Sequence, residues 1–302
     1  MTTGKSRAAL LSIASNSLLI VLKLVAGLLT GSIAILTEAV HSTIDLLASL
    51  VTFVSVRKAD EPADEDHPYG HEKAENVAAG AEAMLILLGA VIIVIEAVRR
   101  LFDGSEVDQV GIGIAVIGFS ILVNLIVSTY LYRRSVALDS PALGGDAAHL
   151  RADALTSFAV LVGLLLVDLT GKPAFDSIAA LTVAFVIVAT AIRLGLRSGR
   201  QLMDEAPPAA ELDQIERAIA GARPEQMAGY HKLRARSAGS RRHIDLHVQF
   251  RSGTSLEEAH RLAHRLRDAI AAEVGNADVL IHVEPEESYL HGSERPGPLR
   301  HG

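Results

Sequence analysis

The sequence contains no cysteine among its 302 residues. Disulfides, thiolate nucleophiles and sulfur-rich metal sites are therefore excluded, apart from what the four methionines could contribute. Any metal ion that this chain binds must be held by nitrogen and oxygen atoms.

Charged residues are also scarce, at 21% of the chain, while half of the residues are apolar and the mean hydropathy is positive. Water-soluble domains are seldom so apolar. The formal net charge is -7, and no cluster of Lys and Arg is interleaved with aromatic residues, so a nucleic acid is not an expected partner. The apolar residues collect before residue 200, which predicts a membrane part followed by a soluble part.

Six stretches are long and apolar enough to cross about 30 Å of hydrocarbon as helices. They are Ala8–Leu29, Ile33–Val56, Ala78–Leu101, Val110–Leu131, Ser140–Leu169 and Phe175–Leu196. An even number of spans places both ends of the chain on the same side of the membrane.

Lys and Arg residues are concentrated on the side that holds the two ends. That side carries Lys5, Arg7, Arg57, Lys58, Lys73, Arg133, Arg134, Arg193, Arg197 and Arg200, against Arg99, Arg100 and Lys172 on the other. The positive-inside rule therefore predicts a multi-pass protein of the inner (cytoplasmic) membrane with both termini in the cytoplasm.

The residues after Met203 have the pattern of a small soluble domain. The expected elements are helices at 211–220 and 255–272 and strands at 231–236, 242–251 and 279–284. In the second strand, apolar and polar residues alternate, which places His247 on the face opposite Leu246 and Val248. We expect an α/β sandwich of α-β-β-α-β order over residues 204–287. It follows an all-α six-helix transmembrane domain (1–203) and precedes a disordered tail (288–302).

An internal repeat carries the clearest chemical signal. The segment EAVHSTID (residues 38–45) recurs as DAAHLRAD (residues 146–153). His41 and Asp45 are four residues apart, as are His149 and Asp153, so each pair shares one face of its helix. Two such helices facing each other would offer two imidazoles and two carboxylates, a tetrahedral set that suits zinc. A purely structural role is disfavoured, because burying an Asp in a bilayer costs on the order of a few kcal/mol.

Two further groups of residues contain possible metal ligands. Asp64, His67 and His71 lie in the acidic loop after the second span, where spacing alone leaves open a metal site or an ordinary charged loop. The soluble domain contributes His231, His247, His260, His282 and Glu284. We predict a metal site there, and both a binuclear site and a site at a dimer interface stay open.

Taken together, the six spans, the paired His-x3-Asp motifs and the metallochaperone-like α-β-β-α-β domain resemble the cation diffusion facilitator family over nearly the whole chain. The resemblance implies a homodimer that exports zinc or a similar cation from the cytoplasm in exchange for protons. It implies a transport site at His41, Asp45, His149 and Asp153.

The same resemblance assigns the two other groups. The segment DEDHPYGHEK (residues 64–73) is similar to the second metal site of the family, which implies ligands at Asp64, His67 and His71. The histidines of the soluble domain match positions that bind regulatory zinc in bacterial members. Glu284 stands where some members carry Asp, which leaves a binuclear geometry open.

Several alternatives stay open from the sequence. Cadmium, cobalt, iron and nickel are possible cargoes, and manganese is the least favoured because it prefers oxygen ligands. A membrane metal sensor without transport is a second reading. A membrane metallohydrolase would need an open coordination position and a general base, often in a His-Glu-x-x-His segment, and the sequence has none, so we expect no enzyme. Glu38 and Asp146 could be approach points for the ion or fixed counter-charges.

Overall fold

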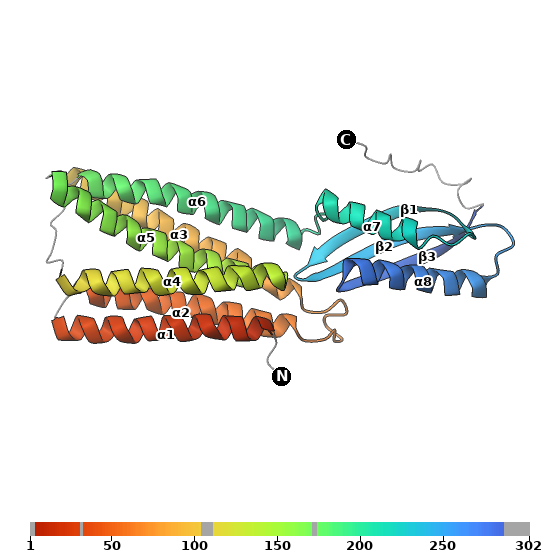
Figure 1. Cartoon of the computed structure of the whole chain (residues 1–302), viewed down its shortest axis with the longest axis horizontal. Helices are drawn as coiled ribbons and strands as arrows, with labels where there is room; N and C mark the ends of the chain where they lie inside the picture. Colours follow the sequence, from red (N-terminus) through yellow and green to blue (C-terminus); the bar gives the residue numbers. More distant parts are fainter. Residues whose placement is uncertain (1–3, 31–32, 104–110, 171–173, 287–302) are drawn as a thin grey trace. The chain divides into compact units, whose positions relative to one another are not determined.

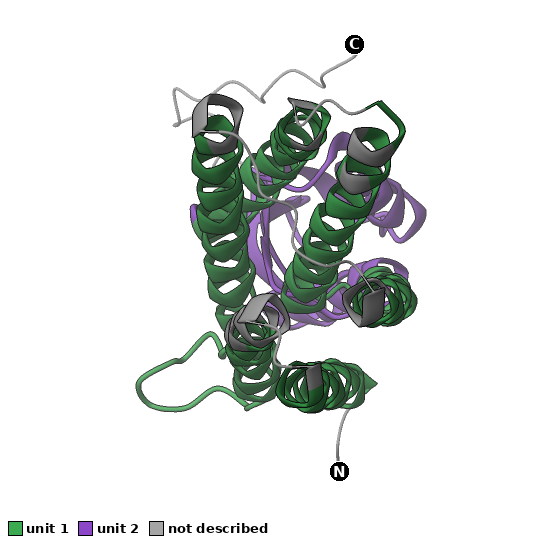
Figure 2. Cartoon of the chain, turned by 90° about the vertical axis from the view of Figure 1, so that its left-hand side faces the viewer, with its two compact units in different colours: residues 1–202 green, residues 203–302 purple. Residues whose placement is uncertain are grey.

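The computed structural model describes residues 4–30, 33–103, 111–170 and 174–286. The chain divides into two compact units, residues 1–202 and residues 203–302 (Figure 2). The described part of the first unit is helical, and the described part of the second unit combines two helices with one sheet. The tail predicted at residues 288–302 lies outside the described residues.

Six long helices make up the described part of the first unit, and Figure 1 shows them running alongside one another. They are α1 (Gly4–Thr30), α2 (Ile33–Ala59), α3 (Lys73–Asp103), α4 (Gly111–Ala137), α5 (Pro141–Thr170) and α6 (Ala174–Leu202). Within the described residues, four of them, α1, α3, α4 and α6, are long and apolar enough to cross a membrane. The other two, α2 and α5, carry the repeated His/Asp motif.

The distribution of side chains in this bundle is the reverse of that in a soluble protein. Large apolar residues such as Leu28, Met84 and Phe185 are mostly exposed, whereas polar residues such as Asn76 and Asp146 are buried. An exposed apolar surface of this extent is a liability in water and is favourable in lipid. Polar side chains turn to the inside of a bundle because hydrocarbon offers them no hydrogen bonds.

The start of α5 follows from its first residues. Ser140 precedes Pro141, and the Leu143 backbone N–H donates to Ser140 Oγ at 3.4 Å, so the serine caps the helix. Ser140 Oγ also donates to Glu75 on α3, and Lys5 on α1 lies 2.5 Å from the same carboxylate. The buried Glu75 therefore joins α1, α3 and α5 at this end of the bundle.

Small residues let α3 approach both α5 and α6. A Cβ added to Gly145 of α5 would lie 3.1 Å from Glu82 Cβ and 3.2 Å from Ala79 Cα, both on α3. A Cβ added to Gly80 of α3 would lie 3.2 Å from Ser198 Oγ on α6. Membrane helices commonly pack through small residues, because lipid provides no hydrophobic force to drive them together. At Gly145 this close packing brings Glu82 against the motif of α5.

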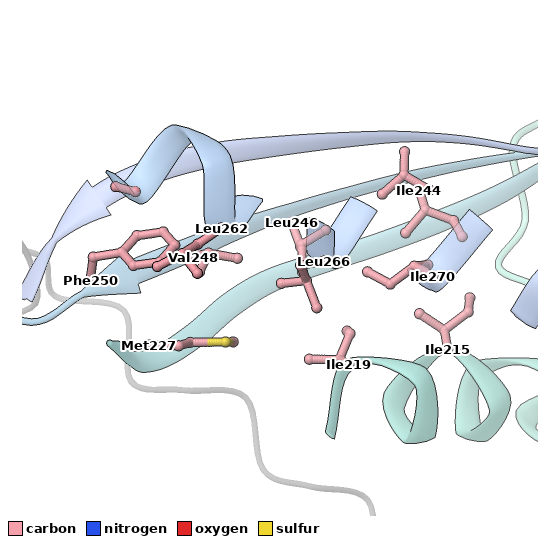
Figure 3. Packing of buried hydrophobic residues seen from close by; sticks show 12 residues of the cluster. Ile215, Ile219, Met227, Ile244, Leu246, Val248, Phe250, Leu262, Leu266 and Ile270 are labelled. Atoms are coloured by element: carbon pink, nitrogen blue, oxygen red, sulfur yellow. The ribbon is translucent and has the colours of Figure 1, made fainter. Parts of the chain in front are cut away.

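The second unit has the predicted α-β-β-α-β order. Its elements are α7 (Ala209–Gly221), β1 (Met227–Ala238), β2 (Arg241–Phe250), α8 (Leu256–Val274) and β3 (Ala277–Pro285). The strands form one sheet in the order β1-β2-β3, in which β2 runs antiparallel to β1 and parallel to β3. The two helices pack on one face of this sheet, where Ile244 and Leu246 of β2 meet Ile215 of α7 and Leu266 of α8 (Figure 3).

The opposite face of the sheet carries a row of histidines. In the strand register, His231 of β1 is the partner of His247 of β2, and His247 is the partner of His282 of β3. Glu284 follows two residues after His282, so its side chain lies on the same face. The alternation along the strands therefore gathers four of the five predicted ligands of this unit on one surface.

We expect Gly145→Leu to destabilise the first unit, because its side chain would overlap Glu82 and the α3 backbone at Ala79. Overpacking of this kind costs about 1–3 kcal/mol. The measurement is thermal unfolding of the purified protein in detergent. Gly118→Leu is the matched control, because no atom lies within 4 Å of a Cβ at Gly118 on α4. Equal melting temperatures for the two variants would contradict the close approach of α3 and α5.

Candidate metal sites

Three of the four residues predicted for the transport site lie together between α2 and α5. The Nε2 atom of His149 is 3.3 Å from Asp45 Oδ1 and 3.8 Å from Asp153 Oδ2. The side chains of Asp45 and His149 are 8% exposed and that of Asp153 is 17% exposed. These three residues are called the interhelical cluster below.

The spacing in the interhelical cluster suits a small metal ion. Two ligand atoms that are each about 2.0 Å from a tetrahedral zinc ion are about 3.3 Å apart. The measured separations of 3.3 and 3.8 Å are close to that value. The side chains of His41, the predicted fourth ligand, and of Glu38 lie outside the described part of the structure.

A third carboxylate, from Glu82 on α3, faces the other nitrogen of the His149 ring. Glu82 Oε2 is 3.6 Å from His149 Nδ1, and neither atom has a hydrogen bond in the described part of the chain. Glu82 Oε1 accepts a hydrogen bond from Thr52 on α2 at 3.1 Å, and the side chain is 1% exposed. The imidazole is therefore placed between Glu82 on one side and Asp45 with Asp153 on the other.

Glu82 is not among the site residues predicted from the sequence. The signal that could have found it is an acidic residue within the predicted span Ala78–Leu101, because an ionisable residue in hydrocarbon is expensive and commonly functional. Its partner could not have been found in this way, because the sequence does not show which helix lies beside α3.

Asp146, the first acid of the α5 motif, belongs to a different set of contacts. It is fully buried, and its Oδ1 accepts a hydrogen bond from Ser49 on α2 at 3.1 Å. Asn16 on α1 donates to Ser49 Oγ at 2.8 Å. Asp146 Oδ2 has no hydrogen bond in the described structure. Asp146 thus connects α5 to α2 and α1 one helical turn before His149.

The loop between α2 and α3 brings Asp64, His67 and His71 together, and these residues form the loop cluster. Asp64 Oδ1 is 3.1 Å from His67 Nδ1, and Asp64 Oδ2 is 3.2 Å from His71 Nε2. The His67 backbone N–H also donates to Asp64 at 2.6 Å, which lowers the pKa of this carboxyl below its usual value. A carboxylate that stays ionised is ready to bind a cation.

The course of the loop follows from one glycine. Gly70 adopts a φ of +92°, a conformation that L side chains rarely adopt, and it lets the chain reverse between His67 and His71. His71 is buried directly before α3, whereas Asp64 and His67 are about half exposed. The loop cluster is therefore open to solvent on one side.

In the second unit, Glu284 joins two strands of the histidine row. Its Oε2 accepts a hydrogen bond from His231 Nε2 at 2.8 Å, and its Oε1 accepts one from His247 Nδ1 at 2.6 Å. Burial would raise the pKa of Glu284, but the hydrogen bonds from these two histidines outweigh it and lower the pKa to about 2. These three residues are called the sheet cluster.

Two of the predicted ligands are not members of the sheet cluster, although the His282 ring centroid is 4.7 Å from that of His247. His282 is 64% exposed, and its Nε2 is 3.7 Å from Glu284 Oε1. His260 lies on α8 with an exposed side chain, and its ring centroid is 4.3 Å from that of His264. Among the described residues, His260 is not part of any group of converging metal ligands.

Comparison with known proteins assigns the family. A family model described as the cation efflux transmembrane domain matches residues 9–203, and a second, described as the cation efflux protein cytoplasmic domain, matches residues 207–286. The chain belongs to the cation efflux (cation diffusion facilitator) family. It is therefore a multi-pass membrane transporter and not an enzyme, and the reading as a metallohydrolase is set aside.

Similar full-length proteins are known from bacteria. An uncharacterised transporter of Synechocystis is 34% identical over 291 residues, which cover 95% of this chain and 94% of that protein. The cation-efflux pump FieF of Salmonella schwarzengrund is 31% identical over 280 residues, which cover 93% and 92% of the two chains.

Solved structures match a shorter part of the chain. The metal-bound C-terminal domain of the CzcD transporter from Thermotoga maritima is 26% identical and covers 29% of this chain and 100% of that domain, with a TM-score of 0.25. The Zn form of CzrB is 36% identical and covers 28% of this chain and 93% of that one, with a TM-score of 0.24.

We expect the metal-free sheet cluster of this cation efflux protein to lose stability in acid. The folded-state pKa of Glu284 lies below the ordinary value of 4.5, so the ionised carboxylate stabilises the fold above about pH 4.5. This stabilisation is lost as the pH falls toward about 2. Glu284→Gln should therefore lower the free energy of unfolding above that range, and the difference from the parent should shrink as acid is added.

The measurement is urea unfolding of chelator-treated protein, followed by circular dichroism at a series of pH values. Glu225→Gln is the matched control, because Glu225 is an exposed residue in the turn before β1. A difference between Glu284→Gln and the parent that stays constant with pH would show that the two histidines do not lower the Glu284 pKa.

Proposed function

We propose that this chain exports a divalent transition metal, most favourably zinc, from the cytoplasm by proton antiport. The transport site in this proposal consists of His41, Asp45, His149 and Asp153. The single observation that carries it is the interhelical cluster, in which residues from both copies of the repeat converge in a buried place. Membership of the cation efflux family supports transport as the activity.

The chemistry of the cluster supports exchange of a metal for protons. Imidazole nitrogen and carboxylate oxygen bind either a proton or a metal ion, so each cation displaces the other. In the proposed cycle, the deprotonated site takes metal from the cytoplasm, the helices rearrange, and protons from the outer side release the metal. The balance of nitrogen and oxygen ligands favours zinc, while cadmium, cobalt, iron, nickel and manganese are the alternatives.

Glu82 acts in this proposal on the orientation of His149. When a metal occupies Nε2, the proton of the neutral ring is on Nδ1, which faces Glu82 Oε2. A carboxylate in this position fixes the tautomer and makes the ring a better ligand. Thr52 holds the other oxygen of Glu82, so that the carboxylate stays directed at the ring.

In this proposal, the loop cluster and the sheet cluster have supporting roles. The loop cluster is a second metal site near the cytoplasmic end of α2 and α3, and the sheet cluster is a regulatory zinc site. The proposed assembly is a homodimer in the inner membrane with both termini in the cytoplasm. The excess of Lys and Arg near Lys5, Lys58, Arg134 and Arg200 supports this orientation.

We expect Asp45→Ala or Asp153→Ala to reduce zinc flux to the level of empty liposomes, because each change removes a charged ligand from the buried site. The measurement uses purified protein in liposomes loaded with a metal-sensitive dye, with and without a pH gradient. Zinc, cadmium, cobalt, nickel, manganese and ferrous iron are compared in turn.

The matched control for this experiment is Asp213→Asn, which changes an exposed acid of the second unit. Full zinc flux in either interhelical variant would refute the proposed transport site. Flux that does not respond to the pH gradient at any pH would refute antiport. Metal binding without flux in the parent would favour the sensor reading.

We expect Glu82→Gln to raise the zinc concentration for half-maximal flux about 10- to 100-fold, the usual cost of losing a carboxylate partner of a metal-bound histidine. The melting temperature of the protein should change little, because Gln keeps the size of the side chain and can still accept the hydrogen bond from Thr52. Glu96→Gln on the same helix is the control. Unchanged zinc dependence in Glu82→Gln would show that Glu82 does not act through His149.

A further inference from the structure

A cavity of about 640 Å³ lies in the first unit between α4, α5 and α6 and apart from all three clusters. Three arginines line it: Arg151 on α5, and Arg193 and Arg197 on α6. Among the described residues of its wall, the only acid is Asp139, in the turn between α4 and α5. The cavity is therefore strongly positive.

The charges of these arginines are not balanced by the described protein. The Arg151 guanidinium lies 4.5 Å from the centre of the Tyr132 ring, and Arg193 Nε donates to the Ala189 carbonyl at 3.1 Å. Within the described residues, none of the three arginines forms an ion pair with a carboxylate. Arg193 and Arg197 are exposed and Arg151 is partly exposed, so an anion from outside the chain can reach these guanidinium groups.

The cavity does not serve the exported cation. Successive residues of an α-helix are separated by about 100°, so Arg151 lies about 200° around α5 from His149. Ala148 and Ala152 line the cavity, whereas His149 and Asp153 are turned toward α2. Three positive charges would also repel a divalent metal ion.

The cavity has a polar end and an apolar end. At about 1.5 Å per residue, Arg151 lies about 15 Å from the start of α5, and Arg193 lies about 14 Å from the end of α6. Leu155 and Ile187 line the cavity about 6 to 9 Å beyond these arginines, toward the middle of the same helices. The arginines thus mark one level of the cavity, and apolar side chains continue below them.

We propose that this cavity binds an anionic phospholipid, with its phosphate on Arg151 and Arg193 and an acyl chain along Leu155 and Ile187. Guanidinium groups bind phosphate oxygens through paired hydrogen bonds and keep their charge at any physiological pH. The ligand chemistry is that of a phosphate group, and the apolar continuation of the cavity favours a lipid over free phosphate. The proposal is independent of which cation the protein exports.

The test uses the full chain in nanodiscs of phosphatidylcholine with increasing phosphatidylglycerol. Protein is extracted into mild detergent, and the bound lipid is quantified by mass spectrometry. We expect the parent to retain phosphatidylglycerol in preference to phosphatidylcholine. In the variant R151Q/R193Q, this preference should fall about fivefold for each arginine removed, hence about 25-fold in total.

The matched control is R57Q/R133Q, which removes two exposed arginines outside the cavity and should keep the preference of the parent. An equal loss in both double variants would overturn the cavity as the site, because general surface charge would explain it. Equal retention of the two lipids by the parent would overturn the proposal whether or not the variants fold. If millimolar inorganic phosphate displaced the lipid from the parent, the proposal of a lipid ligand would be overturned in favour of free phosphate.

Discussion

The structure of the first unit depends on the placement of one imidazole among carboxylates in a buried place. His149 faces Asp45 and Asp153 through one ring nitrogen and Glu82 through the other, so that α2, α3 and α5 all contribute to its surroundings. Carboxylates that are brought this close repel one another unless a cation or protons are present. Either protons or a cation would therefore relieve the repulsion within this group of side chains.

The close approach of α3 to α5 is what makes this arrangement possible. Gly145 lacks the side chain that would displace Glu82, and Thr52 on α2 orients the Glu82 carboxylate through a hydrogen bond. A helix pair that can shift at such a contact changes the distance between Glu82 and His149 directly. The position of Glu82 beside His149 and the packing of α3 on α5 therefore depend on the same few atoms.

The sequence predicted the chain of elements well because their signals are local. The start of α5 at Ser140 and Pro141 follows from capping chemistry, and the alternation along β2 places His247 on the face away from the core. The pairing of the two motifs could also be inferred, because a repeat of His and Asp at the same spacing indicates a shared site. Helix ends were less certain: α3 begins at Lys73, five residues before the predicted span, because polar residues at the membrane edge extend a helix without adding hydropathy.

Contacts between distant segments could not be read in this way. Glu82 meets His149 only because α3 packs beside α5, and the arginines of α5 and α6 share a cavity only because those helices are neighbours. His260 shows that residue type and sequence position do not by themselves place a side chain in a group of ligands. Its residue type and position in the sequence matched a ligand, yet its helix places it beside His264 and outside the groups of converging ligands among the described residues.

The bridge formed by Glu284 has a mechanical consequence for the second unit. Glu284 is near the end of β3, and its carboxylate reaches across β2 to His231 on β1. This hydrogen bond links the two ends of residues 231–284, a segment that contains most of the sheet and all of α8. Release of this carboxylate would remove a constraint on both outer strands at once, whereas β2 would keep its neighbours. The outer strands should then exchange their amide hydrogens with solvent sooner than the central one.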